Sequence, residues 1–544
     1  MGRQKNNLKI HALFMAAICV FLASPAQASA SLDNAKAIPI LNNGRVKAFD
    51  SFCRQTLEKI AGKETWNKKD AVSVLLGIIA SEEKIDGIPW VLVGNAELRS
   101  AFGLPADKRY FSYAEIIPSL EKILASMKSS QEKRDADKST SSLEKETESL
   151  YARLVAVRDL MTGESLRLIP SSDKNGEVWL TLAESANTEH GRRFKTLLKL
   201  FSEKKMAEFN AETGRWNVWV HETTHDAYRG TIQLEVIYSD AKPFQWAWIF
   251  YLAAFIMLSF FKKLKFVKKT GIVLVASAMV FHTLGLVLRV LVLQRPPVSN
   301  MYESMVYMNW AVMVFAAFFA LGTRNVVYLS AGSALSALVM IYGDLLPIDA
   351  NLEVLVPVLR SNYWLTVHVM TIVSSYGAFG LAMALGHRHL ILEMKGKFSK
   401  TAQEDSAQLI YRVIQLGILL LGIGTVLGGV WANESWGRFW GWDPKETWAL
   451  ITFVAYLVVV HLKYAKKIDS HWLAMSSVLG FFFVLMTWYG VNFVLGRGLH
   501  SYGFGSGGMK WIIYYVVAEI VFLGVVGSRR AHSDTNHRTA ATHK

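Results

Sequence analysis

The stretch GIVLVASAMVFHTLGLVLRVLVL, residues 271–293, decides the fold of this chain. It is apolar and long enough to cross a bilayer as a helix, because about 20 apolar residues span the hydrocarbon core. Comparable runs lie on both sides of it, at 244–261, 303–321, 326–346, 363–385, 410–430, 447–465, 472–494 and 510–527. We therefore predict a polytopic α-helical membrane protein with about nine transmembrane helices.

The charges between these runs predict the orientation of the chain. Basic residues gather at 261–269, 387–400 and 463–467 and in the tail from Arg529. The positive-inside rule predicts that all four segments are cytoplasmic, and nine crossings from an external start place them there. The loops near 294–302, 347–362, 431–446 and 495–509 then face outward. We expect a multi-pass protein of the cytoplasmic (inner) membrane. Most of the excess behind its net charge of +15 is assigned to the inner loops, so we expect no nucleic-acid partner.

The region before the first run is polar and mixed. Residues 1–28 have a basic start, a short apolar run and an Ala26-Gln27-Ala28 end, which predict a cleaved signal peptide; an uncleaved anchor is the alternative. The stretch 126–148 favours a solvated helix, with a disordered linker as the alternative. Together with strand patterns at 37–45, 177–182 and 231–238, it predicts an extracytoplasmic (periplasmic) α+β domain over 29–243. The membrane domain then covers 244–528, and a cytoplasmic tail covers 529–544.

The two cysteines limit the chemistry. Cys19 would leave with the signal peptide, so Cys53 alone can form neither an internal disulfide nor a cysteine-rich metal site. The chain also lacks a Cys-x-x-Cys-His run, so it is not itself a c-type cytochrome.

An aromatic loop is predicted over 431–448, where the outward segment contains WGRFWGWDPKETW at 436–448. Such a surface suits a large, flat, apolar partner. An interfacial aromatic belt is the alternative, but a belt explains one or two tryptophans per helix end. Asp443, Pro444 and Glu446 have the spacing of a helix capping box rather than of an acid–base pair. The residues predicted to contact the flat partner are Trp431, Trp436, Trp440, Trp442, Asp443 and Trp448.

Four histidines suggest that the partner is haem. His282 and His461 lie inside predicted spans, about 16 Å and 21 Å from the outer ends at 1.5 Å per residue. They either hold one iron between them or bond separately to neighbouring helices. His368, at the outer start of the fifth span, and His500, in an outward loop, should lie beside the aromatic loop. A neutral imidazole is a common axial ligand of haem iron.

Other charged residues fit around these histidines. Arg289, Arg295, Arg438 and Arg497 could pair with the haem propionates or with lipid headgroups. We interpret His387, His389 and His471 as solvated residues of cytoplasmic loops.

The run from Trp436 to Leu450 resembles the tryptophan-rich WWD domain of haem-handling membrane proteins, and most closely the CcsA (ResC) family of cytochrome c biogenesis, system II. The resemblance covers about the last 260 residues. It implies haem b (iron protoporphyrin IX) as cofactor, with His368 and His500 ligating the iron at an outer site and His282 and His461 at an inner site. The Tyr302-Glu303-Ser304 run resembles a further motif of the family, whose role the sequence does not give.

The resemblance also implies a function. The chain would transport and present haem and attach it covalently to apocytochrome c, which offers a Cys-x-x-Cys-His motif, at the outer face of the membrane. It would act as a holocytochrome c synthase (haem lyase) with a CcsB (ResB)-like subunit and a thioredoxin-like thiol reductant, although no residue stands out as a catalytic acid, base or nucleophile. The alternatives are a haem exporter or chaperone serving a separate synthase, and an integral b-type electron carrier.

A competing motif, His-Glu-x-x-His, occupies residues 221–225. Zinc proteases carry this motif on a helix so that both histidines face one way. The β-branched and aromatic flanks here predict strand and turn instead, and no third ligand stands out. We therefore do not expect a zinc site.

Overall fold

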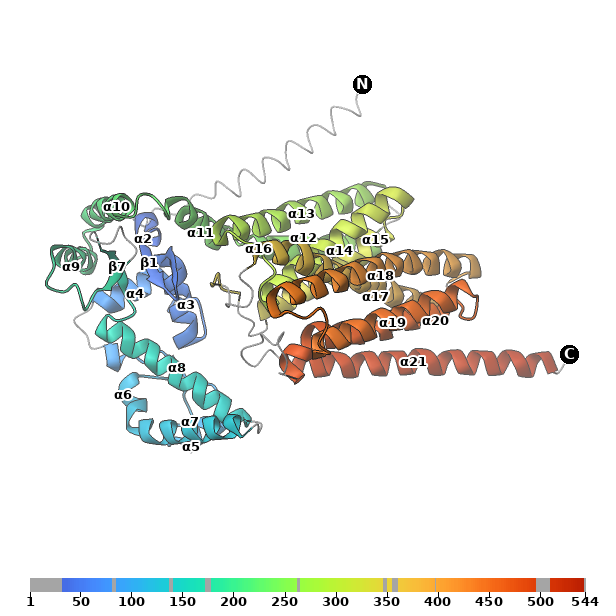
Figure 1. Cartoon of the computed structure of the whole chain (residues 1–544), viewed down its shortest axis with the longest axis horizontal. Helices are drawn as coiled ribbons and strands as arrows, with labels where there is room; N and C mark the ends of the chain where they lie inside the picture. The colour runs from blue at the N-terminus through green and yellow to red at the C-terminus, as the bar shows by residue number, and fades with distance from the viewer. Residues whose placement is uncertain are drawn as a thin grey trace, which may run out of the picture. The chain divides into compact units, whose positions relative to one another are not determined.

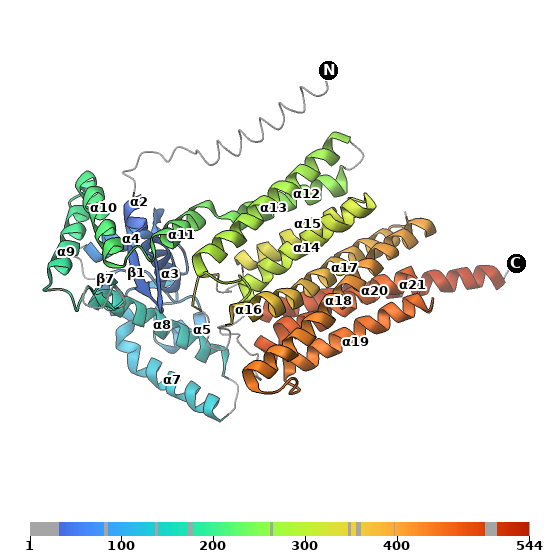
Figure 2. The same cartoon turned by 45° about the horizontal axis from the view of Figure 1, so that its top comes forward.

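A computed structural model describes residues 32–80, 85–136, 140–171, 178–261, 265–345, 350–354, 361–396, 398–495 and 509–542 of the chain. It divides into two compact units, Met1–Val236 and Ile237–Lys544 (Figures 1 and 2). The division lies close to the boundary that the change of composition predicts. The predicted signal peptide, residues 1–28, lies outside the described residues, so its cleavage stays a prediction.

The first unit contains a small antiparallel sheet of four strands in the order β2-β1-β7-β8. The β1–β2 hairpin turns at Asn43 and Gly44, which both have positive φ, as the two-residue turn of a tight hairpin requires. This hairpin confirms the strand and turn predicted at 37–45, and β8 confirms the strand predicted at 177–182. The bounds are β1 Pro39–Asn42, β2 Arg45–Ala48, β7 Arg167–Pro170 and β8 Trp179–Thr181.

Helices surround this sheet and share its apolar core. Two of them, α7 and α8, make the stretch predicted over 126–148 helical in its described residues, but as two helices instead of one. The α-helices are α2 Asp33–Lys36, α3 Phe49–Ala61, α4 Ala71–Ala80, α5 Ala96–Ala101, α6 Tyr113–Ile116, α7 Leu120–Asp135, α8 Ser142–Thr162, α9 Glu189–Ser202 and α10 Met206–Thr223. Short strands pair as β3 Thr65–Trp66 with β4 Lys69–Asp70 and as β5 Val91–Leu92 with β6 Tyr110–Phe111.

The strand predicted at 231–238 is wrong, because these residues belong to helix α11, Arg229–Ala241. Ile232 and Glu235 are buried and lie three residues apart, which places them on one helical face. Arg45 donates two hydrogen bonds of 2.8 and 2.7 Å to the Glu235 carboxylate, so β2 holds this face of α11. Tertiary packing therefore overrides the strand preference of the β-branched residues here.

The second unit is a helical bundle. Within the described residues, nine helices are long and apolar enough to cross a membrane, and they correspond to the nine predicted runs. The chain is thus a polytopic helical membrane protein. The elements are α12 Pro243–Phe260, α13 Lys265–Leu293, α14 Met301–Thr323, α15 Val327–Leu345, α16 Asn362–Trp364, η5 Leu365–Val369, α17 Met370–Met394, α18 Lys400–Trp436, α19 Pro444–Tyr464, α20 Ser470–Leu485, η6 Met486–Leu495 and α21 Met509–Thr542.

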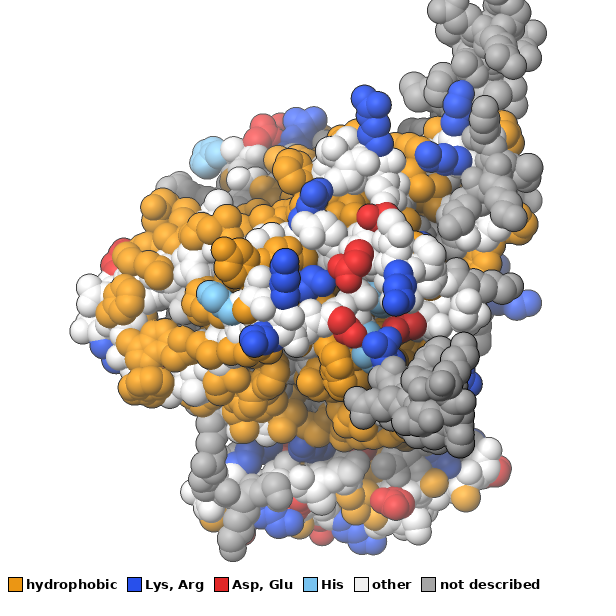
Figure 3. All heavy atoms as spheres, turned by 90° about the vertical axis from the view of Figure 1, so that its right-hand side faces the viewer, with side chains coloured by type: hydrophobic (Ala, Val, Ile, Leu, Met, Phe, Trp, Pro, Cys, Tyr) orange, Lys and Arg blue, Asp and Glu red, His pale blue; other side chains and the backbone are white. Residues whose placement is uncertain are grey.

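The up-and-down order of the helices gives the bundle two different ends (Figures 1 and 2). The α12–α13, α17–α18 and α19–α20 connections and the end of α21 lie at one end, which is the right-hand end in Figure 1. Lys and Arg side chains are prominent on the face viewed from that side (Figure 3). The opposite end carries the α18–α19 loop, α16 and the last residues of η6. The four basic segments therefore share one end of the bundle, as their charges predict.

Glycines allow α17 and α18 to pack closely. A Cβ at Gly424 would lie 3.0 Å from the Cβ of Ile372, and a Cβ at Gly417 would meet the Phe379 ring. Small residues at helix contacts are the usual way in which membrane helices approach each other. This contact matters because α17 and α18 together support the residues described next.

Candidate haem-binding end of the bundle

His368 lies in η5, a turn of π-helix between α16 and α17. Its Nδ1 donates a hydrogen bond of 2.8 Å to the carbonyl oxygen of Gly424 in α18. A carbonyl only accepts, so this contact fixes the proton on Nδ1 and leaves the lone pair of the neutral ring on Nε2. Histidines that bind metals usually donate their other ring N–H to a carbonyl or carboxylate, which orients the ring, so this bond is compatible with a ligand role for Nε2.

The surroundings of the His368 ring come from one face of α18. A Cβ at Gly428 would lie 2.6 Å from His368 Cε1, so the ring occupies space that only glycine leaves open. The indole of Trp431 lies next to the imidazole, with ring centroids 5.6 Å apart. Trp431 is buried in α18, whereas the sequence placed it in the loop at 431–448. That boundary is wrong, because α18 continues past its apolar run and ends at Trp436.

The aromatic loop is therefore short, and it begins where Gly437 ends α18 in the left-handed conformation. Phe439 is half exposed, and its ring lies where a Cβ of Gly429 would otherwise be. The rings of Trp440 and Trp442 meet edge to face, with centroids 5.7 Å apart, and Trp442 is 68% exposed. The loop thus presents aromatic faces outward rather than burying them.

The start of α19 confirms the predicted capping box. Asp443 accepts from the Lys445 amide at 3.0 Å, and Glu446 accepts from the amides of Asp443 and Gly441 at 3.2 and 2.8 Å. Both carboxylates hold backbone, so neither is placed as a catalytic acid or base. Arg438, 3.7 Å from Glu446, helps to fold the loop back onto the helix. Trp448 lies in the first turns of α19, which this box fixes.

The two histidines predicted to form an inner pair have different surroundings. His282 is completely buried in α13, and its Nδ1 and Nε2 lie 3.2 Å from Tyr251 Oη and 3.0 Å from the Val306 carbonyl oxygen. Both ring nitrogens therefore have protein partners. His461 is exposed near the end of α19, with Nδ1 bonded to the Leu457 carbonyl at 2.7 Å. Both views place α13 and α19 on opposite sides of the bundle, so the structure does not bring this pair together (Figures 1 and 2).

Arg289 and Arg295 bind a buried carboxylate, not an open surface. Glu303 is fully buried and accepts from Arg289 at 2.9 Å and from Arg295 at 2.7 Å. The amide and hydroxyl of Ser299 donate to the same carboxylate at 2.9 and 2.8 Å. This hub of Arg289, Arg295 and Glu303 gives the Tyr302-Glu303-Ser304 motif a structural role. The suggested pairing of these two arginines with propionates or lipid headgroups does not fit their burial.

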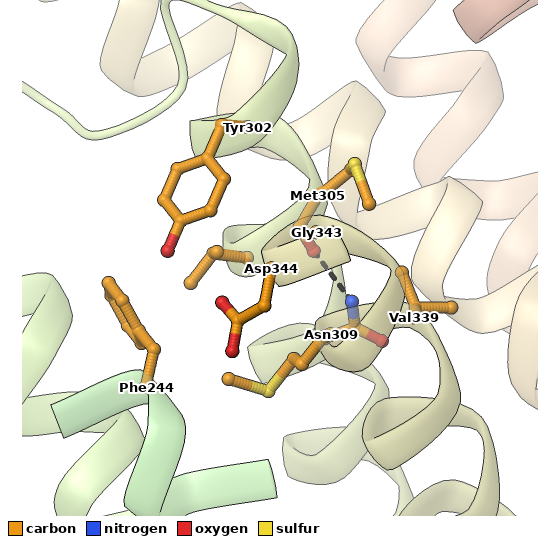
Figure 4. A pocket seen from close by; sticks show the side chains of 9 residues that line it. Phe244, Tyr302, Met305, Asn309, Val339, Gly343 and Asp344 are labelled. Carbon is orange, nitrogen blue, oxygen red and sulfur yellow. Dashed lines mark hydrogen bonds between the residues drawn. The ribbon is translucent and has the colours of Figure 1, made fainter. Parts of the chain in front are cut away.

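His500 and Arg497 lie outside the described residues, so their predicted roles at the outer site stay predictions. Among the described residues, a small pocket lies between α12, α14 and α15 (Figure 4). Phe244, Tyr302 and Asp344 line it, and Figure 4 shows the Asp344 carboxylate between the two rings. The space that the pocket encloses is about 10 Å³, far below the roughly 300–1,000 Å³ of typical small-molecule pockets. The pocket is therefore too small for haem, and the aromatic loop is the better candidate surface.

Comparison with known proteins agrees with this geometry. Residues 298–500 match the family described as Cytochrome C assembly protein. The chain is 35% identical over 233 residues to the cytochrome c biogenesis protein CcsA of Guillardia theta, covering 38% of this chain and 76% of that protein. It is 31% identical over 293 residues to CcsA of Trieres chinensis, covering 46% of this chain and 92% of that protein. The chain belongs to the CcsA family.

A third relative is similar over both units. Protein NrfI of Wolinella succinogenes is 30% identical over 488 residues, which is 85% of this chain and 53% of NrfI. The chain therefore spans about half the length of that protein. Since the second unit begins only at Ile237, a match of this extent must include much of the first unit.

Three histidines of this CcsA-family chain are not solvated, as the sequence had suggested. His387 lies against Glu519 of α21, with Nε2 2.9 Å from the carboxylate. His471 bonds to Glu393 at 2.7 Å and is 2% exposed, and His389 is fully buried. The prediction was wrong because these residues lie in α17 and α20, which extend beyond the apolar runs. Glu519 inside an otherwise apolar run was the signal that a partner was needed.

The His-Glu-x-x-His segment is mostly helical, which corrects the strand and turn prediction. His221 lies in the last turn of α10, while His225 follows the helix with a φ of 50°. The two imidazoles therefore do not share a helical face. Among the residues that the structure describes, no group of three or more potential ligands is placed to hold a metal ion.

Proposed function

We propose that the CcsA-type unit binds haem b at the end of the bundle that carries the aromatic loop, and presents it for covalent attachment to an apocytochrome c. The observation that carries the proposal is His368, a ring fixed through Nδ1 to Gly424 and lying beside Trp431. The family membership supports a role in cytochrome c biogenesis. An oriented imidazole and partly exposed aromatic rings at the same end of the bundle support haem as the partner.

The residues of the chain would divide the work as follows. His368 supplies one axial ligand, and the bond to Gly424 holds the direction of the ring. Phe439, Trp440 and Trp442 offer partly exposed aromatic rings for apolar contact with the macrocycle. We propose His500 as the second axial ligand. No described side chain is placed as an acid or base, so the chain contributes ligation, orientation and exclusion of water.

The attachment itself joins two groups that the substrates bring. A cysteine thiol of the apocytochrome adds across a haem vinyl group: the sulfur bonds to one vinyl carbon, and the thiol proton ends on the other. The step needs no net oxidation or reduction. A thioredoxin-like reductant would be needed only beforehand, to keep the two cysteines of the apocytochrome as thiols.

We also propose an orientation and a partner. The basic end of the bundle would face the cytoplasm under the positive-inside rule, so the aromatic loop and the first unit would be periplasmic in the inner membrane. A CcsB (ResB)-like subunit would complete the synthase. We retain His461 as a proposed inner ligand and assign His282 a structural role, since both of its ring nitrogens are bonded.

The test is to purify the detergent-solubilised chain, co-expressed with a CcsB-like subunit, and to record its absorption spectrum. We expect a haem Soret band that His368→Gly weakens and added imidazole restores. The His282→Asn variant should leave the wavelength of the Soret band unchanged. A colourless wild-type preparation would refute the proposal. Haem that loads but is passed to a separate synthase without thioether formation would favour the exporter, and haem that never leaves would favour the electron carrier.

A further inference from the structure

We propose that Glu434 is a positioning residue for His368, acting through the indole of Trp364. This inference rests on the proposed haem-binding function and adds to it a second anchor for the axial ligand. It starts from the backbone at His368. Residues Leu365–Val369 form a π-helical turn, in which the chain carries an additional residue relative to an α-helix. Isolated π-turns are frequent at functional sites.

The π-turn decides where His368 points. Successive residues of an α-helix differ in direction by about 100°, since there are 3.6 residues per turn. If the turn relaxed to α-helix while Trp364 stayed in place, His368 would rotate by roughly that angle. The hydrogen bond from Nδ1 to the Gly424 carbonyl would then be lost. The ligand direction therefore depends on what holds the turn on its N-terminal side.

Trp364 holds that side. Its side chain is buried, and its indole Nε1 donates a hydrogen bond of 2.7 Å to Glu434 Oε2. Its backbone amide donates to the hydroxyl of Ser361 at 3.3 Å, which caps the short α16. Glu434 is otherwise an exposed residue of α18, and within the described part of the chain Trp364 is the partner of its carboxylate. Because Glu434 is exposed and binds one buried indole, it can fix the orientation of Trp364 without contributing to the packing of the apolar core.

All of these contacts lie on one stripe of α18. Gly424, Gly428, Trp431 and Glu434 follow one another at spacings of four, three and three residues, which keeps them on the same helical face. Glu434 anchors the start of the turn, Trp431 packs beside the imidazole, and the Gly424 carbonyl oxygen accepts the hydrogen bond from Nδ1. Gly424 and Glu434, the two outer residues of the stripe, lie about 15 Å apart along the α18 axis at 1.5 Å per residue. They hold the two ends of the π-turn through His368 and Trp364.

The test compares three substitutions that separate the acceptor from the charge. Glu434→Leu removes the acceptor, Trp364→Phe removes the donor, and Glu434→Gln retains an acceptor oxygen. The matched control is Glu404→Leu, an exposed glutamate at the other end of α18 that pairs with Lys463. Hydrogen exchange of residues 362–370, measured by mass spectrometry on the chain without added haem, reports the π-turn independently of haem. The absorption spectrum of the haem-loaded protein, with and without imidazole, reports the ligation.

We expect Glu434→Leu and Trp364→Phe to speed exchange in this segment several-fold and to convert part of the haem to a high-spin spectrum that imidazole reverses. Glu434→Gln and Glu404→Leu should resemble the wild type. Unchanged exchange in Glu434→Leu would overturn the inference, as would equal loss of haem in the Leu and Gln variants. If the wild type bound no haem while exchange still responded to Glu434→Leu, the proposed function would fail and the anchoring of the turn would stand.

A second pair of variants tests the direction of the ring itself. Gly428→Ala places a methyl group 2.6 Å from His368 Cε1, and Gly524→Ala is the control because a Cβ there meets open space. We expect Gly428→Ala to displace the ring and to reproduce the spectral change of Glu434→Leu, with a smaller change in hydrogen exchange. A wild-type spectrum in Gly428→Ala would show that the ligand does not depend on this orientation.

Discussion

Replacing Glu303 tests whether the hub of Arg289, Arg295 and Glu303 holds the bundle together. Glu303→Ala leaves two guanidinium groups that are 0% and 5% exposed without their carboxylate. Breaking a buried ion pair from one side costs about 3–5 kcal/mol, because the remaining charge stays desolvated. With 1.4 kcal/mol per factor of ten, this is a shift of roughly 100- to 4,000-fold in the unfolding equilibrium.

The assay is denaturant unfolding of the detergent-solubilised protein, followed by tryptophan fluorescence. Glu303→Gln retains an acceptor oxygen but removes the charge, so it should be destabilised by less than the Ala variant. Glu404→Ala is the matched control, since this carboxylate is 63% exposed and its pairing with Lys463 should contribute only about 0–1 kcal/mol. A Glu303→Ala variant that unfolds within about 1 kcal/mol of the wild type would refute the reasoning, because it would mean that water reaches both arginines.

Three further outcomes follow from the structure. Burial raises the pKa of the Cys53 thiol well above its usual range. Iodoacetamide at pH 8 should therefore leave Cys53 unlabelled in the native chain and label it in denaturant, as measured by mass spectrometry. Rapid labelling of the native chain would contradict this burial. Burial lowers the pKa of His190 below 6.5, so the neutral ring stabilises the fold above that pH and this stabilisation is lost as the pH falls. Hydrogen exchange in α9 should therefore be faster at pH 5 than at pH 7, after correction for intrinsic rates. The His190→Phe variant should remove part of this difference. Gly386→Val would place a Cβ 2.2 Å from Ser477 Oγ and should destabilise the α17–α20 contact by about 1–3 kcal/mol, whereas Gly322→Ala, in open space, should not alter the unfolding midpoint.

The membrane helices were predictable because the bilayer imposes a simple demand on the sequence. A segment that crosses the hydrocarbon core must be apolar over about 20 residues, whatever its neighbours are. The same signal does not give helix ends, since a helix can continue into water. Helix α18 shows this difference: its apolar run stops near Val430, but the helix continues to Trp436. The aromatic loop was therefore predicted too long, and Trp431 was assigned to it instead of to the helix face beside His368.

The first unit shows a different limit. The aromatic and β-branched residues of α10 and α11 favour strands locally, yet both segments are helices. Phe209, Thr213, Trp216 and Val220 are all buried at spacings of four, three and four residues, so the helical face packs into the core. Such long-range packing overrides local preference, and a single sequence does not show it.

The site itself was partly predictable. The tryptophans and His368 stand out by residue type and place, and Asp443 and Glu446 by the spacing of a capping box. What the sequence could not give was the partner of each polar group. His282 was expected to face an iron, but its nitrogens meet Tyr251 and Val306. The sequence gives no sign of a role for Glu434, because its partner Trp364 is distant along the chain.

The contact between His387 and Glu519 has a consequence for the rotation of α21 about its own axis. Nε2 of His387 lies 2.9 Å from the Glu519 carboxylate, and Nδ1 of the same ring donates to the Met383 carbonyl at 2.9 Å. Apolar packing between helices tolerates rotation, whereas a hydrogen-bonded contact has a preferred direction. Since only 17% of the apolar window of α21 is buried, this polar contact with α17 is well placed to select one rotational setting of the last helix.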